Sequence, residues 1–258
     1  MLSLAVLSVL SASPVEGLPV VGHLDAPGGT RVTIRGALSK ARARQLVTLA
    51  AEVQGDVTRR FLTATDKSVL PPVELCLFER SADYDAFVAQ LLEGARSLSP
   101  LGFFDPARRV VVANVGLSVG NLRHELAHAL LHDDWPDIPA WLTEGVGALY
   151  GTAALERGGF RFLPNYRLRH LRAARKAGTL PTLSQLARST ADEVYGARVL
   201  EFYALARASL LYLDAHGTLR ATFDALRGAT TADARERVLL GAVQADAFFT
   251  WTDGLVLR

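Results

Sequence analysis

The sequence predicts an α+β fold, in which a small mixed sheet with its helices is followed by a mostly helical C-terminal half. Two observations support this prediction. In the first half, short apolar runs typical of strands alternate with longer segments whose apolar residues recur at helical spacing. Beyond Gly159 the spacing is helical almost throughout, with breaks at Pro164, Pro181 and Gly217. The expected order is strand, helix, strand, helix, strand and then helices.

Three segments carry the alternation or the β-branched composition of strands: 30–35, 73–78 and 109–115. Four segments carry helical periodicity: 46–61, 82–92, 118–131 and a stretch that begins at Ala140 after Pro139. The pair Pro71 and Pro72 separates the first helix from the second strand, because proline cannot continue a helix. A length of 258 residues accommodates one large domain or two small subdomains that share a core.

Composition excludes several classes of protein. Half of the residues are apolar and the formal net charge is +2, which argues against disorder and against a dedicated nucleic-acid binder. The chain has one cysteine, so an intramolecular disulfide is excluded. That residue, Cys76, lies in the apolar run PVELCLFE, and we interpret it as a buried structural thiol.

Residues 2–10 form an apolar run that is followed by small residues, as in the core and cleavage site of a secretory signal. The run lacks preceding positive charges, and it is far too short to cross a bilayer, which takes about 20 residues. We expect residues 1–17 to be a signal peptide or an apolar N-terminal segment, and the protein to be exported to the periplasm, the envelope or the medium. The alternatives are a buried first strand, or a start codon placed a few residues late, in a cytoplasmic protein.

The segment NLRHELAHAL contains the pattern HExxH. On a helix, His124 and His128 lie about 6 Å apart along the axis and on one face, so two imidazoles can reach one Zn²⁺ ion. Glu125 is turned by about 100° from His124, so it can reach a zinc-bound water without binding the metal. A surface helix with two solvated histidines is the alternative interpretation.

A catalytic zinc site needs a third protein ligand. A third histidine six residues after His128, typical of metzincins, is excluded because that position is Asp134. Glu144 lies in the next helix, and the polar, proline-bearing segment before it can turn the chain back. Its neighbours, Trp141 among them, are apolar, which is an unusual setting for a solvated carboxylate. We therefore predict that His124, His128 and Glu144 bind one zinc ion.

The segments HELAHALL and IPAWLTEGVGALY resemble the peptidase MA-like group of gluzincin zinc metallopeptidases, which is distantly similar to thermolysin-type enzymes. The likeness extends over about residues 70–255. There GFFDPARRVVVAN is similar to the strand region before the zinc helix, and FYALARASLLYLDAHG resembles the helix after the site. The resemblance implies a zincin-like α/β subdomain over residues 18–150, which carries the zinc-binding helix. It also implies a helical subdomain of the same catalytic domain over residues 151–258.

The resemblance implies hydrolysis of peptide bonds by metal-activated water, with Glu125 as general base. It further implies that segment 109–115 is an edge strand that pairs with the backbone of an extended substrate. One departure concerns the residue that orients a zinc histidine. Thermolysin-like enzymes carry an acidic residue four positions after the ligand glutamate, and here that position is Ala148. The orienting partner must therefore come from elsewhere in the chain.

The oxyanion that develops during hydrolysis needs a second hydrogen-bond donor besides the metal. Tyr203 is the candidate, because FYALAR resembles a tyrosine-bearing stretch of the family. Tyr195 and Arg207 lie in the same region of the sequence. Ordinary helix packing explains Tyr203 equally well.

The expected partner is a peptide or protein substrate, and nucleic acid is not expected. The sequence leaves open the choice between endopeptidase and aminopeptidase, membrane association and the oligomeric state. Segment 165–176 is rich in arginine, and we interpret it as a solvated face, with contact to an acidic substrate or an anionic surface as the alternative. The competing function is a catalytically silent zincin-fold module that binds or scaffolds in the cell envelope. The presence of all three ligands and the base favours the enzyme.

Overall fold

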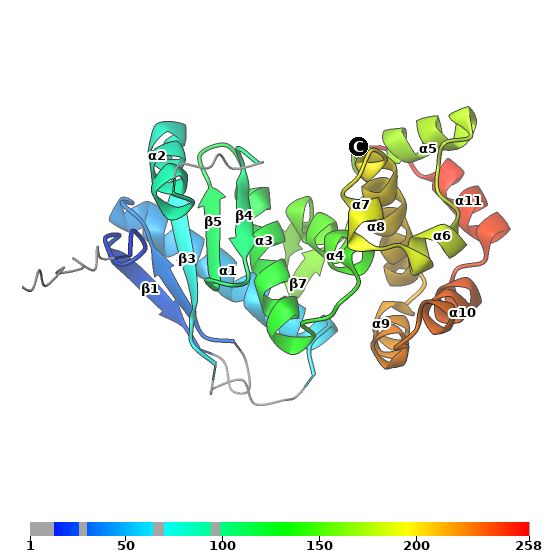
Figure 1. The fold of residues 1–258 in the computed structure, drawn as a ribbon, viewed down its shortest axis with the longest axis horizontal. Helices are drawn as coiled ribbons and strands as arrows, with labels where there is room; N and C mark the ends of the chain where they lie inside the picture. Colours follow the sequence, from blue (N-terminus) through cyan, green and yellow to red (C-terminus); the bar gives the residue numbers. More distant parts are fainter. Residues whose placement is uncertain (1–12, 26–29, 64–69, 94–98, 258) are drawn as a thin grey trace, which may run out of the picture.

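The computed structural model describes residues 13–25, 30–63, 70–93 and 99–257, so the candidate signal at residues 2–10 lies outside the described part. Over that part, a sheet lies at one end and a group of helices at the other (Figure 1). The fold combines α and β structure around a small mixed sheet, as the sequence predicts. None of the helices in these residues is both long and apolar enough to pass through a membrane.

The main sheet has five strands in the order β1-β2-β3-β5-β4. The central strands β2, β3 and β5 are parallel, whereas β1 and β4 are antiparallel additions at the two edges. Their bounds are Val20–Leu24 (β1), Val32–Arg35 (β2), Val73–Phe78 (β3), Gly102–Asp105 (β4) and Val110–Asn114 (β5). The periodicity predicts the three central strands but not the two edges, which are short and partly exposed.

The position of the edge strand is a correction. The resemblance placed it at segment 109–115, but β5 lies in the interior, between β3 and β4, and β4 forms the edge (Figure 1). All five residues of β5 are buried, as expected for a strand covered on both faces. A tight turn folds β4 back along β5, and Arg109 has a positive φ of 54° at its end. The free edge of the sheet on this side therefore belongs to β4.

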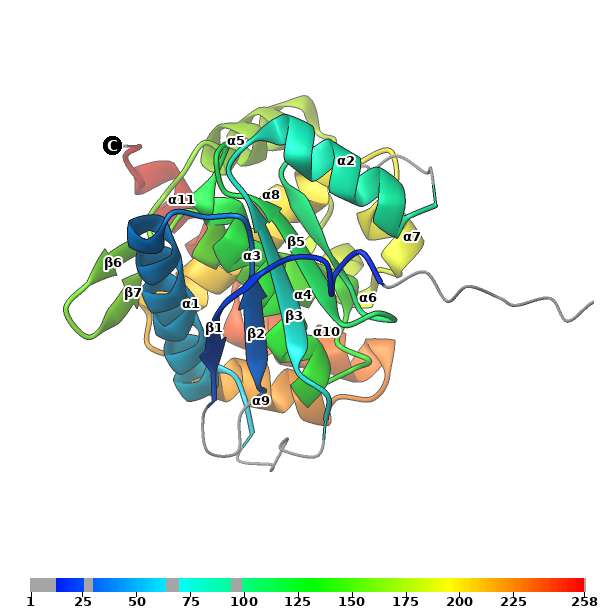
Figure 2. The ribbon, with the colours of Figure 1, turned by 90° about the vertical axis from the view of Figure 1, so that its left-hand side faces the viewer.

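Three helices cover the two faces of the sheet: α1 (Lys40–Arg60), α2 (Ser81–Leu91) and α3 (Val119–Asp134). The strands β1, β2, β3 and β5 lie side by side (Figure 2). Successive side chains of β3 alternate between two apolar cores. Leu75 and Leu77 belong to the core that includes α1 and α3, while Cys76 and Phe78 pack with α2. Burial raises the pKa of the Cys76 thiol to about 12, in keeping with its interpretation as a structural residue.

The second half of the chain is mostly helical and shares the core of the first. Its helices are α4 (Ala140–Gly151), α5 (Arg167–Ala177), α6 (Leu183–Arg188), α7 (Ala191–Val194), α8 (Val199–Ala215), α9 (Leu219–Gly228), α10 (Ala232–Ala242) and α11 (Ala245–Gly254). A small hairpin, β6 (Ala154–Glu156) and β7 (Gly159–Arg161), interrupts them and is not predicted from the sequence. One apolar core runs from Leu75 in the sheet to Phe202 in α8, so the two halves form a continuous interior.

α3 and α4 pack against each other at very short range. Gly120, at the start of α3, lies against Gly151, at the end of α4. A Cβ atom on Gly120 would meet the Gly151 carbonyl oxygen at 2.2 Å. The other end of α3 is held by the buried Asp134 carboxylate, which pairs with Arg227 of α9. The two helices are therefore antiparallel and fixed in register.

Gly120→Ala tests this close approach. The added methyl group would collide with the backbone of α4, so we expect the free energy of unfolding to fall by about 1–3 kcal/mol. Gly241→Ala is the matched control, because Gly241 also lies in a helix and nothing lies within 4 Å of the added Cβ. There the free energy of unfolding should rise by up to about 1 kcal/mol. Urea unfolding followed by circular dichroism measures both, and equal stability of the two variants would contradict the packing.

Candidate metal centre

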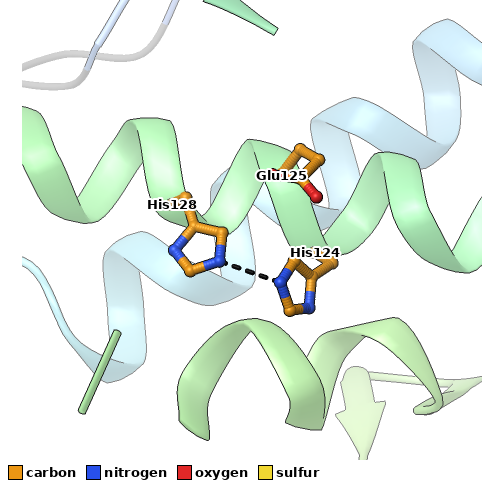
Figure 3. A group of neighbouring side chains, drawn as sticks. All are labelled: His124, Glu125 and His128. Atoms are coloured by element: carbon orange, nitrogen blue, oxygen red, sulfur yellow. Dashed lines mark hydrogen bonds between the residues drawn. The ribbon is translucent and has the colours of Figure 1, made fainter. Parts of the chain in front are cut away.

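The two histidines and the glutamate of HExxH come together on α3 (Figure 3). The Nε2 atoms of His124 and His128 lie 2.9 Å apart. These nitrogens and a carboxylate oxygen of Glu125 all lie within 4.8 Å of one another. The two imidazole side chains are only 16% and 11% exposed, so they are not solvated surface residues.

α4 brings a second carboxylate to the same place. The Oε2 atom of Glu144 lies 3.4 Å from Nε2 of His124 and 3.6 Å from Nε2 of His128. Because the helices are antiparallel, residue numbers that rise along α3 fall along α4, and His124 lies beside Gly147 while His128 lies beside Thr143. The three predicted ligands are thus neighbours in space, with Glu125 next to them.

Gly147 leaves the space that the two imidazoles occupy. A Cβ atom at this position would lie 2.8 Å from Cε1 of His124 and 2.9 Å from Nε2 of His128. Any side chain here would push the rings away from their present positions. The second glycine of EGVG is therefore part of the site, although it offers no ligand atom.

Thr143 is a hydrogen-bond partner of His128. It is placed to orient this histidine, which Ala148 cannot do because it has no polar side chain. The hydroxyl oxygen of Thr143 lies 2.7 Å from Nδ1 of His128. When Nδ1–H donates to this oxygen, Nε2 carries the lone pair that a metal ion needs. The sequence pattern does not reveal this residue, because Thr143 meets His128 only through the register of α3 against α4.

The charge of Glu144 is largely withdrawn from water. Burial by itself would raise the pKa of this carboxyl group, but the imidazoles of His128 and His124 hold it well below its usual range. Burial would likewise lower the pKa of His128, whereas Glu144 and, to a lesser extent, Glu125 raise it above the usual value. Within the described residues, Oε2 of Glu144 is buried without a hydrogen-bond partner, which is costly for an anion.

Two tyrosines approach Glu144 from the helical half. The Tyr195 hydroxyl donates to Oε1 of Glu144 at 2.9 Å. The Tyr203 ring lies 6.5 Å from that of Tyr195, and both residues line the same cavity. Burial and the Glu144 carboxylate raise the pKa of each tyrosine well above its ordinary value. Both hydroxyl groups therefore keep their protons near neutral pH and can act as hydrogen-bond donors.

Arg207 supports α4 and is not among the described residues that line the cavity. It is therefore not an oxyanion donor, although the sequence places it in the same region as Tyr203. It is 3% exposed and donates to the carbonyl oxygens of Ala148 and Leu163 and to the Thr152 hydroxyl. All three are neutral acceptors on α4 or in the segment after it. The guanidinium therefore holds α4 in place from behind the site.

A cavity of about 950 Å³ opens over the metal-centre residues. One wall is formed by the edge strand β4, and the other by α5, α7 and the start of α8. His132, one turn beyond His128, also lines the cavity, and its ring centroid lies 5.7 Å from that of Phe104. The site thus lies at the junction between the sheet and the helical half.

The residues fit a metal ion of the zinc kind. Two imidazole nitrogens and one carboxylate oxygen form a donor set of catalytic zinc sites. A divalent cation would also satisfy the buried Oε2 atom of Glu144, which otherwise has no hydrogen-bond partner among the described residues. No protein-family model matches the chain, and a search of curated proteins finds no match. The case for a metal centre therefore rests on the geometry of α3 and α4.

Thr143→Val tests the role of the threonine hydroxyl. Valine has nearly the same shape but cannot accept the proton on Nδ1 of His128, so we expect the affinity for added Zn²⁺ to fall about 10- to 100-fold. Thr143→Ser keeps the hydroxyl and should restore most of the affinity. Competition with a chromophoric chelator measures the dissociation constants. Equal affinities of the valine variant and the unmodified protein would show that Thr143 does not orient His128.

Proposed function

We propose that the chain is a zinc-dependent peptidase of the gluzincin type, with one zinc ion bound by His124, His128 and Glu144. The observation that supports this most is the buried Oε2 atom of Glu144, which meets the Nε2 atoms of two histidines on a different helix. Such a set of three ligands leaves a fourth position for water. When bound, zinc lowers the pKa of water toward about 7 and polarises a substrate carbonyl group.

Glu125 is the proposed general base. It lies beside the proposed ligands on α3 and is only 8% exposed, so its carboxylate would be within reach of a water held there without being one of the three ligands. It takes a proton from the water as the oxygen attacks the carbonyl carbon. It then delivers that proton to the nitrogen of the leaving amine as the peptide bond breaks.

Tyr203 is the proposed donor to the developing oxyanion. Three tyrosines line the cavity, namely Tyr166, Tyr195 and Tyr203. The Tyr195 hydroxyl is engaged with Oε1 of Glu144, and the Tyr203 ring lies next to that of Tyr195, beside the candidate ligands. The raised pKa of Tyr203, which is due to burial and to Glu144, keeps its proton available for donation. A hydrogen bond that forms only as negative charge develops stabilises the transition state more than the substrate.

The substrate is proposed to be a peptide segment in extended conformation. β4 is the edge of the sheet and lines the cavity through Gly102, Phe103 and Phe104. An edge strand presents unpaired backbone groups to which an extended peptide can add as a further strand. The cavity volume of about 950 Å³ lies at the upper end of the range for small-molecule sites, which suits several residues of a peptide.

Glu125→Gln should keep zinc and lose hydrolysis, because an amide cannot take the proton while the three ligands stay in place. We expect one zinc ion per chain in both proteins, and cleavage of a mixed peptide library that falls at least 100-fold in the variant. Emission spectrometry measures zinc, and mass spectrometry of the products, with and without a chelator, measures cleavage. Full activity of the variant would exclude Glu125 as the base. Zinc binding without cleavage by the unmodified protein would instead indicate a silent binding module.

Tyr203→Phe removes one hydroxyl group and keeps the ring. If Tyr203 stabilises the oxyanion, kcat should fall about 100- to 1000-fold while the zinc content stays the same. Steady-state kinetics on a peptide taken from the library experiment, together with zinc analysis, test this. An unchanged kcat would mean that Tyr203 only packs against its neighbours.

A further inference from the structure

Arg167 differs from the other arginines of the basic helix α5. Arg172 and Arg175 bind the end of α11, through its backbone carbonyl groups and the Asp253 carboxylate. Arg169 is exposed on the outer surface. Arg167, the first residue of α5, is half-buried and lines the cavity. The solvated-face interpretation of this segment therefore does not hold for Arg167.

The guanidinium of Arg167 lies over two aromatic rings in the wall of the cavity. Its central carbon lies 5.3 Å from the ring centroid of Tyr166 and 5.1 Å from that of Tyr203. The attraction of a cation to an aromatic ring does not use up the N–H donors of a guanidinium. Within the described residues, this guanidinium has no hydrogen bond or ion pair. A guanidinium that lies against aromatic rings with its N–H donors unused can bind a carboxylate in a bidentate manner.

The charge of Arg167 is not explained by the stability of its helix. It occupies the N-terminal end of α5, where the helix dipole disfavours a cation, and the first turn contains no acidic residue. Arg207 lies behind it and donates only to neutral acceptors, so its charge is not neutralised locally. Burial and then the repulsion from Arg167 lower the pKa of Arg207 to about 10. Arg167 is therefore the cation that faces the cavity, with the buried Arg207 behind it.

The cavity separates its charges into two regions. The carboxylates among its described lining residues, Glu125 and Glu144, belong to the metal centre, and Arg167 is the one lysine or arginine among them. Tyr203 connects the two regions, because its ring lies under Arg167 while Glu144 influences its hydroxyl group. The free guanidinium is thus about one side chain away from the place where a scissile bond would lie.

We propose that Arg167 binds a carboxylate group of the peptide substrate next to the scissile bond. The peptidase then prefers peptides that carry an acidic side chain, or a free C-terminal carboxylate, at this position. The inference rests on the proposed function, and it adds to that function a class of substrate. The carboxylate would complete the pairing of a cation that the described residues leave without an anion.

Matched peptides separate the two sources of the carboxylate. The zinc-loaded full chain is given pairs of peptides that differ by Glu against Gln on either side of the cleavage site, or by a free against an amidated C-terminus. Two variants each remove one charge from α5: Arg167→Gln, and Arg169→Gln as the exposed control. We expect the unmodified protein and Arg169→Gln to favour one carboxylate peptide by about 10- to 100-fold in kcat/KM, mainly through KM. Arg167→Gln should reduce that ratio to about one, and Arg167→Lys should restore part of it.

Two outcomes would overturn the inference. One is the absence of any preference between acid and neutral peptides in the unmodified protein. The other is a fall in kcat that Arg167→Gln shows equally for all peptides, because Arg167 would then act through Tyr203.

Failure of the proposed function gives a different result, in which no peptide is cleaved by the unmodified protein. In that case fluorescence anisotropy with labelled acidic and neutral peptides tests the binding directly. Tighter binding of the acidic peptide, lost in Arg167→Gln, supports the role of Arg167. Equal binding of the two peptides contradicts it.

Discussion

The close antiparallel contact between α3 and α4 is the constraint on which the candidate site depends. Gly120 lets the two backbones approach at one end, and Gly147 leaves room for the imidazoles in the middle. Only at this distance does the Glu144 carboxylate reach both histidine Nε2 atoms. A shift of one helical turn, about 5.4 Å, would separate them completely. The candidate metal centre therefore depends on the packing of the two helices and not on either helix alone.

This contact places an anion in a buried position, and the surrounding structure stabilises it there. Tyr195 donates to one oxygen of Glu144, and the imidazoles face the other. Arg207 holds α4 from behind through the Ala148 carbonyl oxygen. At the far end of α3, the carboxylates of two consecutive aspartates are fully buried in ion pairs with arginines from the turn before β5 and from α9. Breaking a buried pair of this kind leaves a charge without compensation, so these pairs hold the end of α3 against its neighbours.

The cavity over the metal centre draws on both halves of the chain. β4 and α3 provide the sheet edge, the histidines and Glu125, whereas α5, α7 and α8 bring the tyrosines and Arg167. The continuous apolar core explains how residues so far apart in sequence hold a common position.

Several features could be predicted from the sequence because they depend on short-range periodicity. Alternation of apolar residues predicts the central strands, and helical spacing predicts the helices α1 to α4. The i, i+4 spacing of His124 and His128 places both on one face of α3. Glu144 could be named because a charged residue in an apolar helix needs a partner. The edge position of β4 could not be predicted from the sequence. It arises only when this four-residue strand pairs with β5, and that pairing is a tertiary contact.

From the sequence, Tyr195 is named only as a neighbour of Tyr203, and Arg167 only as part of a basic segment, while Thr143 is not named at all. Thr143 meets a histidine 15 positions earlier, and the Tyr195 hydroxyl meets a carboxylate 51 positions earlier. Arg167 looks like any other arginine of a basic helix until α5 is packed against α8. Local spacing determined which residues can form a metal site. The tertiary packing of α3, α4, α5 and α8 decided what surrounds it, because contacts between distant segments depend on helix register that no local pattern encodes.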